Sequence, residues 1–229
     1  MIGGSRTSPR RAAPLRALVV VAHPRADSYT RAVADAAVDG LRAGGHAVEV
    51  IDLYAEGFRP AMSLEERRAY ATDEPLVEEQ TRAHAELVRW CDAMVFVYPT
   101  WWSGLPAILK GWLERVLVVG VAFRFHERTG KVRPGLKRMR FVVGISTYGS
   151  PWSYVKAVND NGRRVLHRAL RMSCGVRTRT VWLGLYAIDT STHAERVAFV
   201  ERVRTRMAGL GRPRRARRRT GPARVQVPR

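Results

Sequence analysis

The sequence has only two cysteines in 229 residues, Cys91 and Cys174, and their separation does not match a zinc site. Two thiols are too few for a disulfide framework, which favours a reducing compartment, the cytoplasm, and two inert core thiols. No apolar run approaches the length of a membrane span. The apolar stretch 17–22 follows Arg10 and Arg11, but it is too short for a secretion signal and is interpreted as a buried strand.

Acidic residues are absent from both ends of the chain. Residues 1–16 carry four arginines and residues 212–229 carry eight, so more than half of the formal charge of +20 lies in these ends. The arginine run at 212–219 is compatible with nucleic-acid binding, but a solvated tail is the simpler interpretation. We expect three parts of the chain: a disordered tail over 1–14, one domain over 15–210 and a disordered arginine-rich tail over 211–229.

The chain also lacks the motifs GxGxxG and GxxxxGK(S/T), which excludes the usual dinucleotide fingerprint and phosphate loop. Strand-like and helix-like segments alternate instead. Strands are predicted at 15–22, 47–53, 93–98, 139–146 and 176–183, helices at 28–43, 64–70, 75–91, 105–116, 152–172 and 192–210, and a loop or small hairpin at 120–137. Parallel strands need crossovers of this length, so we predict an α/β domain whose five-stranded parallel sheet has helices on both faces.

Ligands bind at the carboxyl ends of the strands in such sheets, so the loops after the first, third and fourth predicted strands are the candidate site. In the first loop, His23 ends the strand, and Ser28 and Thr30 open a helix. These side chains, the free N–H groups of the first helical turn and the helix dipole are suited to a phosphate. Alternatively, Asp27 or Ser28 only caps the helix, and the sequence leaves both interpretations open.

Aromatic residues collect in the other two loops. Exposed rings are unfavourable unless they cover something flat, so a planar heterocycle is the expected guest. Thr147, Gly149 and Ser150 would let backbone N–H groups approach its polar edge. Alternatively, the aromatic residues fill a gap between helices or form a subunit contact. They are Trp101, Trp102, Tyr148, Trp152 and Tyr154. Trp112 instead lies on the apolar stripe of the helix at 105–116 and is expected to be structural.

Several segments form one recognisable pattern. They are Ala22-His23-Pro24, Asp52-Leu53-Tyr54 with Phe58-Arg59-Pro60, Glu79-Gln80, the segment 99–116 (PTWWSGLPAILKGWLERV) and Gly120-Val121-Ala122-Phe123. Together they resemble the flavin-dependent NAD(P)H:quinone oxidoreductases, over about residues 15–210, and PAILKGW is highly specific within the pattern. The resemblance implies a flavodoxin-like three-layer sandwich with strand order 2-1-3-4-5, a homodimer, bound FAD with FMN as the alternative, and NAD(P)H as co-substrate. No metal site is expected.

The resemblance also assigns a role to each loop residue. The flavin phosphates would be contacted by His23, Ser28, Tyr29 and Thr30, and the ribityl or pyrophosphate region by Gln80. One side of the isoalloxazine would be lined by Pro99, Thr100, Trp101 and Trp102. Backbone groups for its pyrimidine edge would come from Ser146, Thr147, Tyr148 and Gly149. The catalytic residues implied are Tyr154, which polarises the ring or its substrate, and Trp102, an aromatic wall of the pocket.

The sequence departs from the family at two positions. Tyr148-Gly149 stands where the best-studied animal members have two glycines, and Asp160 stands where they have a histidine six positions beyond the tyrosine. A tyrosine–histidine proton relay is therefore not expected.

The expected activity is a ping-pong hydride transfer, in which NAD(P)H reduces the flavin and leaves before a quinone or similar aromatic acceptor takes the hydride. Two alternatives remain open. One is reduction of azo compounds, nitroaromatics or free flavin at the same site. The other is a flavodoxin-like regulatory subunit of a membrane transporter that binds nucleotide without much turnover.

Overall fold

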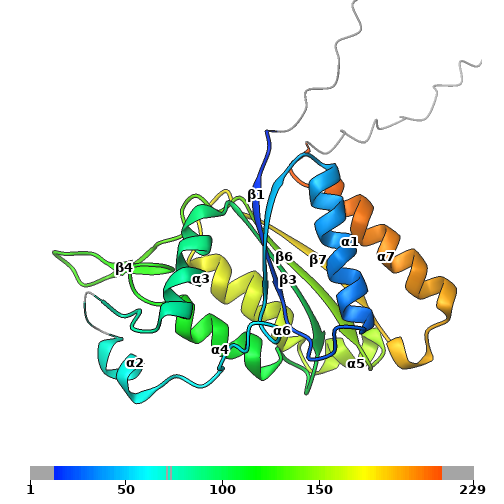
Figure 1. The fold of residues 1–229 in the computed structure, drawn as a ribbon, viewed down its shortest axis with the longest axis horizontal. Helices are drawn as coiled ribbons and strands as arrows, with labels where there is room; N and C mark the ends of the chain where they lie inside the picture. The colour runs from blue at the N-terminus through cyan, green and yellow to red at the C-terminus, as the bar shows by residue number, and fades with distance from the viewer. Residues whose placement is uncertain (1–12, 71, 73, 213–229) are drawn as a thin grey trace, which may run out of the picture.

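A computed structural model describes residues 13–70, 72 and 74–212, so the tails expected at 1–14 and 211–229 lie outside the described residues except at 13, 14, 211 and 212. The chain forms three layers, with a central sheet between helices (Figure 1). The strands of this sheet are β1 (Arg16–Val21), β2 (Ala47–Asp52), β3 (Ala93–Thr100), β6 (Phe141–Tyr148) and β7 (Arg179–Leu185). Their order is β2-β1-β3-β6-β7 and every pairing is parallel, which confirms the predicted fold and strand order.

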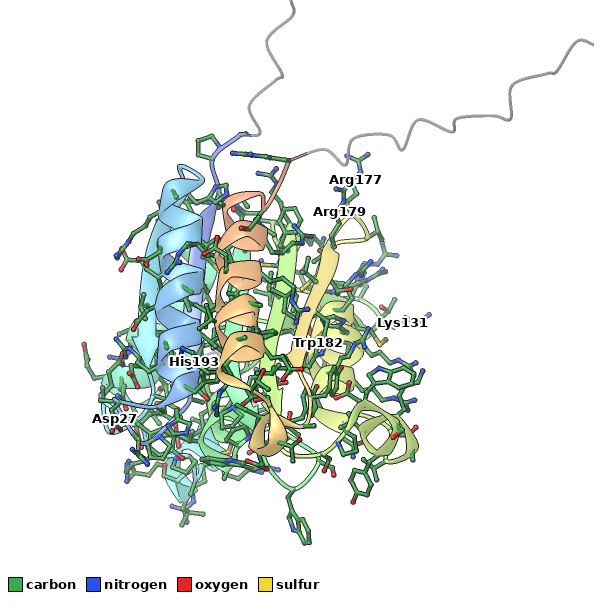
Figure 2. The ribbon with its side chains drawn as sticks, turned by 90° about the vertical axis from the view of Figure 1, so that its right-hand side faces the viewer. Asp27, Lys131, Arg177, Arg179, Trp182 and His193 are labelled. Atoms are coloured by element: carbon green, nitrogen blue, oxygen red, sulfur yellow. The ribbon has the colours of Figure 1, made fainter. Side chains whose placement is uncertain are left out.

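Helices cover both faces of the sheet. Helix α1 (Tyr29–Ala43) and helix α7 (His193–Ala208) lie side by side on one face, as Figure 2 shows. The other face is covered by α3 (Glu79–Trp90), α4 (Ala107–Val116) and the π-helix η1 (Val165–Leu170). The remaining elements are α2 (Leu64–Ala69), α5 (Trp152–Ala157), α6 (Asn161–Arg164), the 3-10 helix η2 (Ile188–Thr190) and a hairpin of β4 (Phe123–Phe125) and β5 (Val132–Pro134). No helix among the described residues is long and apolar enough to span a bilayer.

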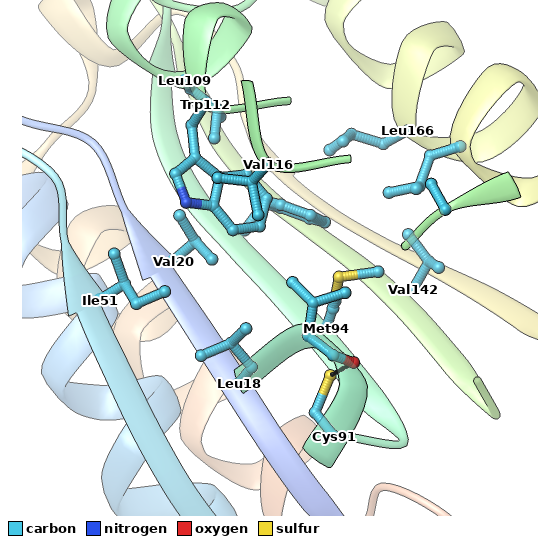
Figure 3. Close-up of a cluster of buried hydrophobic side chains, with 14 of the residues drawn as sticks. Leu18, Val20, Ile51, Cys91, Met94, Leu109, Trp112, Val116, Val142 and Leu166 are labelled. Carbon is cyan, nitrogen blue, oxygen red and sulfur yellow. Dashed lines mark hydrogen bonds between the residues drawn. The ribbon is translucent and has the colours of Figure 1, made fainter. Parts of the chain in front are cut away.

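Each face of the sheet carries its own apolar core, because successive residues of a strand point to opposite sides. Figure 3 shows the core beneath α3 and α4, where Trp112 is completely buried. Its indole Nε1 donates a hydrogen bond to Nδ1 of His84 at 3.2 Å, so the structural role expected for Trp112 is confirmed. Both cysteines are buried as well. Burial raises the pKa of Cys91 to about 12 and that of Cys174 to about 11, as expected for inert thiols.

The segments that carry the family resemblance pack against one another. A Cβ atom on Gly111 of α4 would lie 2.2 Å from the carbonyl oxygen of Pro60, so only glycine allows this approach. One turn further along α4, the buried guanidinium of Arg115 forms ion pairs with Glu66 at 2.8 Å and Glu78 at 2.5 Å. The long connection between β2 and α3 is therefore fixed onto α4.

Three predicted elements need correction. The helix expected over 152–172 is instead α5, followed by a break and then by α6 and η1. The break arises because Asn159 (φ 73°) and Asp160 (φ 45°), between α5 and α6, adopt left-handed backbone conformations. Asn and Asp tolerate this conformation better than other non-glycine residues, and apolar spacing does not report it. The helix expected from residue 75 begins only at Glu79, because Glu78 is extended and pairs with Arg115. The strand expected from residue 176 begins at Arg179.

Candidate active site

The loops after β1, β3 and β6 meet at the carboxyl edge of the sheet, because these strands are neighbours and run in parallel. Thr100 and Tyr148 form the last register pair of β3 and β6. The rings of His23, after β1, and Trp101, after β3, have centroids 6.0 Å apart. The three loops that the sequence singles out therefore form one surface.

In the first loop, Ser28 caps α1. Its Oγ accepts a hydrogen bond from the backbone N–H of Arg31 at 3.1 Å, as the capping alternative predicts. The cap leaves the positive end of the helix dipole in place, so it does not compete with an anion site. The hydroxyl of Tyr29 donates to the carbonyl oxygen of Arg196 in α7 at 2.8 Å, and burial raises the pKa of Tyr29 to about 12. Its phenol therefore packs toward α7, and Thr30 is buried.

Two further predicted residues, His23 and Gln80, hydrogen-bond to the backbone of loops that follow strands. Nδ1 of the half-buried His23 accepts a hydrogen bond from the backbone N–H of Arg25 at 3.1 Å. The exposed Asp27 carboxylate accepts from the Arg25 guanidinium, and this bond lowers the pKa of Asp27. Gln80, in the first turn of α3, donates from Nε2 to the carbonyl oxygen of Glu56 at 3.1 Å. Gln80 thus ties the first turn of α3 to the loop after β2.

The ends of β3 and β6 are joined by side chains as well as by the backbone. Thr100 Oγ1 and Ser146 Oγ form a hydrogen bond of 2.8 Å. Pro99, Ser146 and Thr147 are buried. These residues therefore belong to the packed ends of the two strands and not to a free loop.

The two adjacent tryptophans occupy a tight turn. Trp102 (φ 52°) and Ser103 (φ 58°) are both in the left-handed region, and the backbone N–H of Gly104 donates to the carbonyl oxygen of Trp101 at 3.0 Å. Such a conformation is strained for a bulky residue and is concentrated at functional sites. It turns the Trp102 side chain fully outward, and Trp101 is 42% exposed.

Tyr148 points inward at the end of β6. Its hydroxyl donates to Oδ1 of Asp160 at 2.9 Å, and its ring stacks on Tyr186 with centroids 4.6 Å apart. Burial, together with the nearby Asp160 charge, raises the pKa of Tyr148, so the phenol remains a proton-bearing donor. The next residue, Gly149, is exposed, and a Cβ atom there would lie 2.9 Å from Oδ2 of Asp189.

A cavity of about 260 Å³ lies between the last two loops. It is lined by Thr100, Trp102, Ser103, Tyr148, Gly149, Ser150, Tyr154, Val155, Val158 and Asp160. The structure thus brings together five of the predicted site residues: Thr100, Trp102, Tyr148, Gly149 and Tyr154. The other nine do not line this cavity: His23, Ser28, Tyr29, Thr30, Gln80, Pro99, Trp101, Ser146 and Thr147.

Sequence reasoning missed the part that Asp160 plays in this cavity, having noted it only as a departure from the family. Asp160 has a left-handed backbone, with φ 45° and ψ 60°, lines the cavity and accepts the hydrogen bond from the Tyr148 hydroxyl. The buried hydroxyl of Tyr98 has no hydrogen-bond partner among the described residues. Burial, and then the charge of Asp160, raise the pKa of Tyr98 well above its usual value. The Asn159-Asp160 pair inside a predicted helix was the one available signal.

The arrangement combines exposed aromatic faces with a small set of polar groups. The residues that line the cavity include the aromatic Trp102 and Tyr154 and the hydroxyl-bearing Thr100, Ser103 and Ser150. A planar heteroaromatic ligand with polar edges suits such a site. No group of three or more His, Cys, Asp or Glu side chains able to hold a metal ion occurs in the part of the chain that the structure describes.

The parallel sheet order and the cavity at its carboxyl edge define the class, an α/β protein with a flavodoxin-like fold. The chain belongs to the Flavodoxin_2 family, described as having a flavodoxin-like fold, whose profile matches residues 16–205.

Curated relatives of this chain include named dehydrogenases. NAD(P)H dehydrogenase (quinone) 1 of Rattus norvegicus is 33% identical over 154 residues, which cover 61% of this chain and 56% of the rat protein. Ribosyldihydronicotinamide dehydrogenase (quinone) of Homo sapiens is 29% identical over 213 residues, covering 81% and 87%. The chain spans between 49% and 57% of the length of the first four curated relatives it matches.

Solved structures share the fold. The NAD(P)H:quinone oxidoreductase from Methanothermobacter marburgensis has a TM-score of 0.72 and 26% identity, with 86% of this chain and 98% of that one covered. An FMN-dependent NADH-azoreductase from Bacillus anthracis, solved in complex with FMN, has a TM-score of 0.67. The match covers 86% of this chain and 99% of the azoreductase chain. At 17% identity, this second likeness concerns the fold alone.

Proposed function

We propose that the chain is a flavin-dependent oxidoreductase that transfers hydride from NAD(P)H to a quinone or a similar aromatic acceptor. The observation that carries the proposal is the aromatic cavity at the carboxyl edge of β3 and β6, between Trp102 and Tyr154. Relatives named as quinone dehydrogenases, including the rat and human proteins, support the same activity.

The residues at this edge fit a flavin. The ring of Tyr154 is 52% exposed and that of Trp102 is fully exposed, so both offer flat faces to an isoalloxazine. The exposed Gly149 leaves its backbone open to the polar edge of the ring, and Ser28 at the start of α1 lies at the positive end of the helix, which suits a phosphate. When bound, the flavin would supply the hydride chemistry between NAD(P)H and the acceptor. FAD is the proposed cofactor, because Gln80 and His23 extend the site, and FMN is the alternative.

The residues of the chain would orient the ligands and stabilise charge. The hydroxyl of Tyr154 is the proposed donor to the N1–C2 edge of the flavin, where negative charge develops. Trp102 is the proposed wall that holds the acceptor flat. Tyr148 keeps its proton and is held by Asp160, so this pair fixes the back of the cavity where the family uses a histidine.

A homodimer is part of the proposal. Trp102 and Tyr154, which line the cavity, and Trp152, in the same helix as Tyr154, are all more than half exposed. Large apolar surface of this kind in water is typical of a contact surface. A second copy would cover these rings and place the pocket at the subunit junction. A protein that stays monomeric in sedimentation experiments at micromolar concentration would contradict this part.

Acceptor-dependent oxidation of NADH or NADPH by the purified protein tests the activity. The proposal expects turnover with a soluble quinone and parallel double-reciprocal lines, the pattern of a ping-pong reaction. Intersecting lines, which require a ternary complex, would rule out the two-step scheme. Faster turnover with azo compounds, nitroaromatics or free flavin would assign the site to that alternative. Nucleotide binding without turnover would indicate the regulatory-subunit alternative.

A further inference from the structure

The amino edge of the sheet, opposite the cavity, carries a basic surface. We define this basic edge by Arg138 and Arg140 before β6, Arg177 and Arg179 at β7, and Arg212, all of them exposed. Figure 2 shows Arg177 and Arg179 at the end of β7 that lies away from Asp27 and the ligand loops. The backbone N–H of Arg179 donates to the carbonyl oxygen of Arg140 at 2.9 Å, so the two segments are neighbours.

A hollow at the basic edge is lined by arginine and uncharged residues. It has a volume of about 990 Å³ and is lined by Phe141, Arg179, Thr180, Val181, Arg206, Gly209, Gly211 and Arg212, with no acidic residue among them. The nearby carboxylate of Asp92 is already paired with Arg16 at 3.6 Å and accepts from its backbone N–H. Guanidinium groups are the side chains best suited to phosphate, because they donate two parallel hydrogen bonds.

Both ends of the described chain lie at this same edge. A small cavity is lined together by Ala13 and Pro14 from the start and by Leu210 and Arg212 from the end. The sequence segments 1–16 and 212–229 hold twelve arginines and no acidic residue between them. The two most basic sequence segments are therefore joined to the described chain beside the basic edge.

Exposed apolar side chains stand beside the arginines. Met172, in the helical turn after η1, is 78% exposed, and Val176, in the turn before β7, is 91% exposed. The guanidinium of Arg171 fixes this turn by donating to the carbonyl oxygens of Val176 and Thr178, each at 3.0 Å. Apolar tips among basic residues are typical of surfaces that enter a lipid headgroup layer. The exposed large aromatic side chains of the described residues, on which nucleic-acid bases could stack, lie elsewhere, in the ligand loops and the β4–β5 hairpin.

We infer that the basic edge docks on the surface of an anionic lipid bilayer. The arginines would contact lipid phosphates, and Met172 and Val176 would enter the headgroup layer. Because β3 and β6 run from this edge to the cavity, docking leaves the cavity pointing away from the bilayer and open to water. The inference does not depend on the proposed redox activity.

Vesicle sedimentation with the full-length protein tests the inference. Vesicles of phosphatidylcholine alone are compared with vesicles that also contain phosphatidylglycerol, over a series of salt concentrations. Binding is expected only to the anionic vesicles, and it should weaken as salt rises. The double variant Arg177→Glu/Arg179→Glu should bind roughly tenfold or more weakly. The matched control Arg67→Glu/Arg68→Glu, exposed on α2, should bind like the unchanged protein.

A further double variant measures what the apolar side chains contribute to vesicle binding. Met172→Ser/Val176→Ser should weaken vesicle binding without changing its salt dependence, because no charge is altered. All six side chains substituted in these variants are exposed, so circular dichroism should show unchanged folding.

Several results would overturn the inference. These are equal binding to uncharged vesicles, no binding at low salt, or unchanged binding of the Arg177→Glu/Arg179→Glu protein. Duplex DNA that binds more tightly than the vesicles and displaces the protein from them would instead assign the surface to nucleic acid. Loss of binding only when residues 213–229 are removed would assign the interaction to that segment alone.

Discussion

The hydroxyl of Tyr148 donates a hydrogen bond of 2.9 Å to Oδ1 of Asp160, and this bond joins the end of β6 to the break between α5 and α6. Replacement by Tyr148→Phe leaves the Asp160 carboxylate without this donor. We expect a loss of about 1–3 kcal/mol in the free energy of unfolding, measured by denaturant titration. Asp160→Asn keeps an acceptor oxygen for the phenol and should lose less. Equal losses in both variants would contradict this account of the pair.

The ion cluster of Arg115 gives a second prediction. Arg115 is 2% exposed and pairs with Glu66 and Glu78. Removing it leaves the buried carboxylate of Glu66 without its cationic partner, whereas the half-buried Glu78 keeps its pair with Arg59. Arg115→Met should lower the free energy of unfolding by about 3–5 kcal/mol. The control Lys110→Met, on the same helix, breaks only an exposed pair with Glu114 and should cost less than about 0.5 kcal/mol. Similar costs for the two variants would show that the cluster does not anchor the connection before α3.

The free energy of unfolding should depend on pH through the protonation of His167. Burial, with the charge of Arg163 adding to it, lowers the pKa of His167 to about 4 from the ordinary 6.5, and the ring bonds to the carbonyl oxygen of Val181 at 3.2 Å. The unfolded chain therefore binds a proton between these pH values that the folded chain does not. Stability contributed by the neutral ring is present above pH 6.5 and is lost as the pH falls toward 4, by an amount on the order of 2 kcal/mol.

Thermal unfolding across that pH range checks the His167 prediction. His167→Gln should flatten the fall in stability, whereas the exposed control His193→Gln should keep it. Burial also lowers the pKa of His46, which contributes with the same sign, so the fall should shrink rather than vanish. An unchanged slope in His167→Gln would contradict the assignment.

The catalytic role proposed for Tyr154 is tested by Tyr154→Phe. Loss of one donor to developing negative charge should reduce turnover on the order of a hundredfold while the flavin stays bound. Steady-state rates and the flavin-to-protein absorbance ratio measure the two quantities separately. Tyr70→Phe, a half-buried tyrosine after α2, is the matched control and should keep full turnover. An unchanged rate in Tyr154→Phe would remove Tyr154 from the proposed catalytic residues.

The sequence predicts the fold well because alternation of apolar strands and helices is a local pattern. The strand order, both cores and the burial of Trp112 follow from it. The pattern does not predict the break at Asn159 and Asp160, because the break depends on their backbone conformation. It also does not predict where α3 begins, because Glu78 pairs with Arg115, a residue distant in sequence.

The sequence predicts less of the candidate site, since five of the predicted residues line the cavity. The edge of the sheet and its aromatic residues follow from topology. The contacts of individual side chains cannot be predicted from topology, because they are set by tertiary packing. Examples are the hydrogen bonds from Tyr148 to Asp160 and from Tyr29 to Arg196.

The most direct test of the central claim is the absorption spectrum of the purified protein, followed by chromatographic identification of any released cofactor. A site built from Trp102, Tyr154 and the start of α1 predicts the absorption bands of an oxidised flavin, with about one flavin bound per chain. The released cofactor should be FAD or FMN. A colourless protein that also takes up no flavin from solution would contradict the claim.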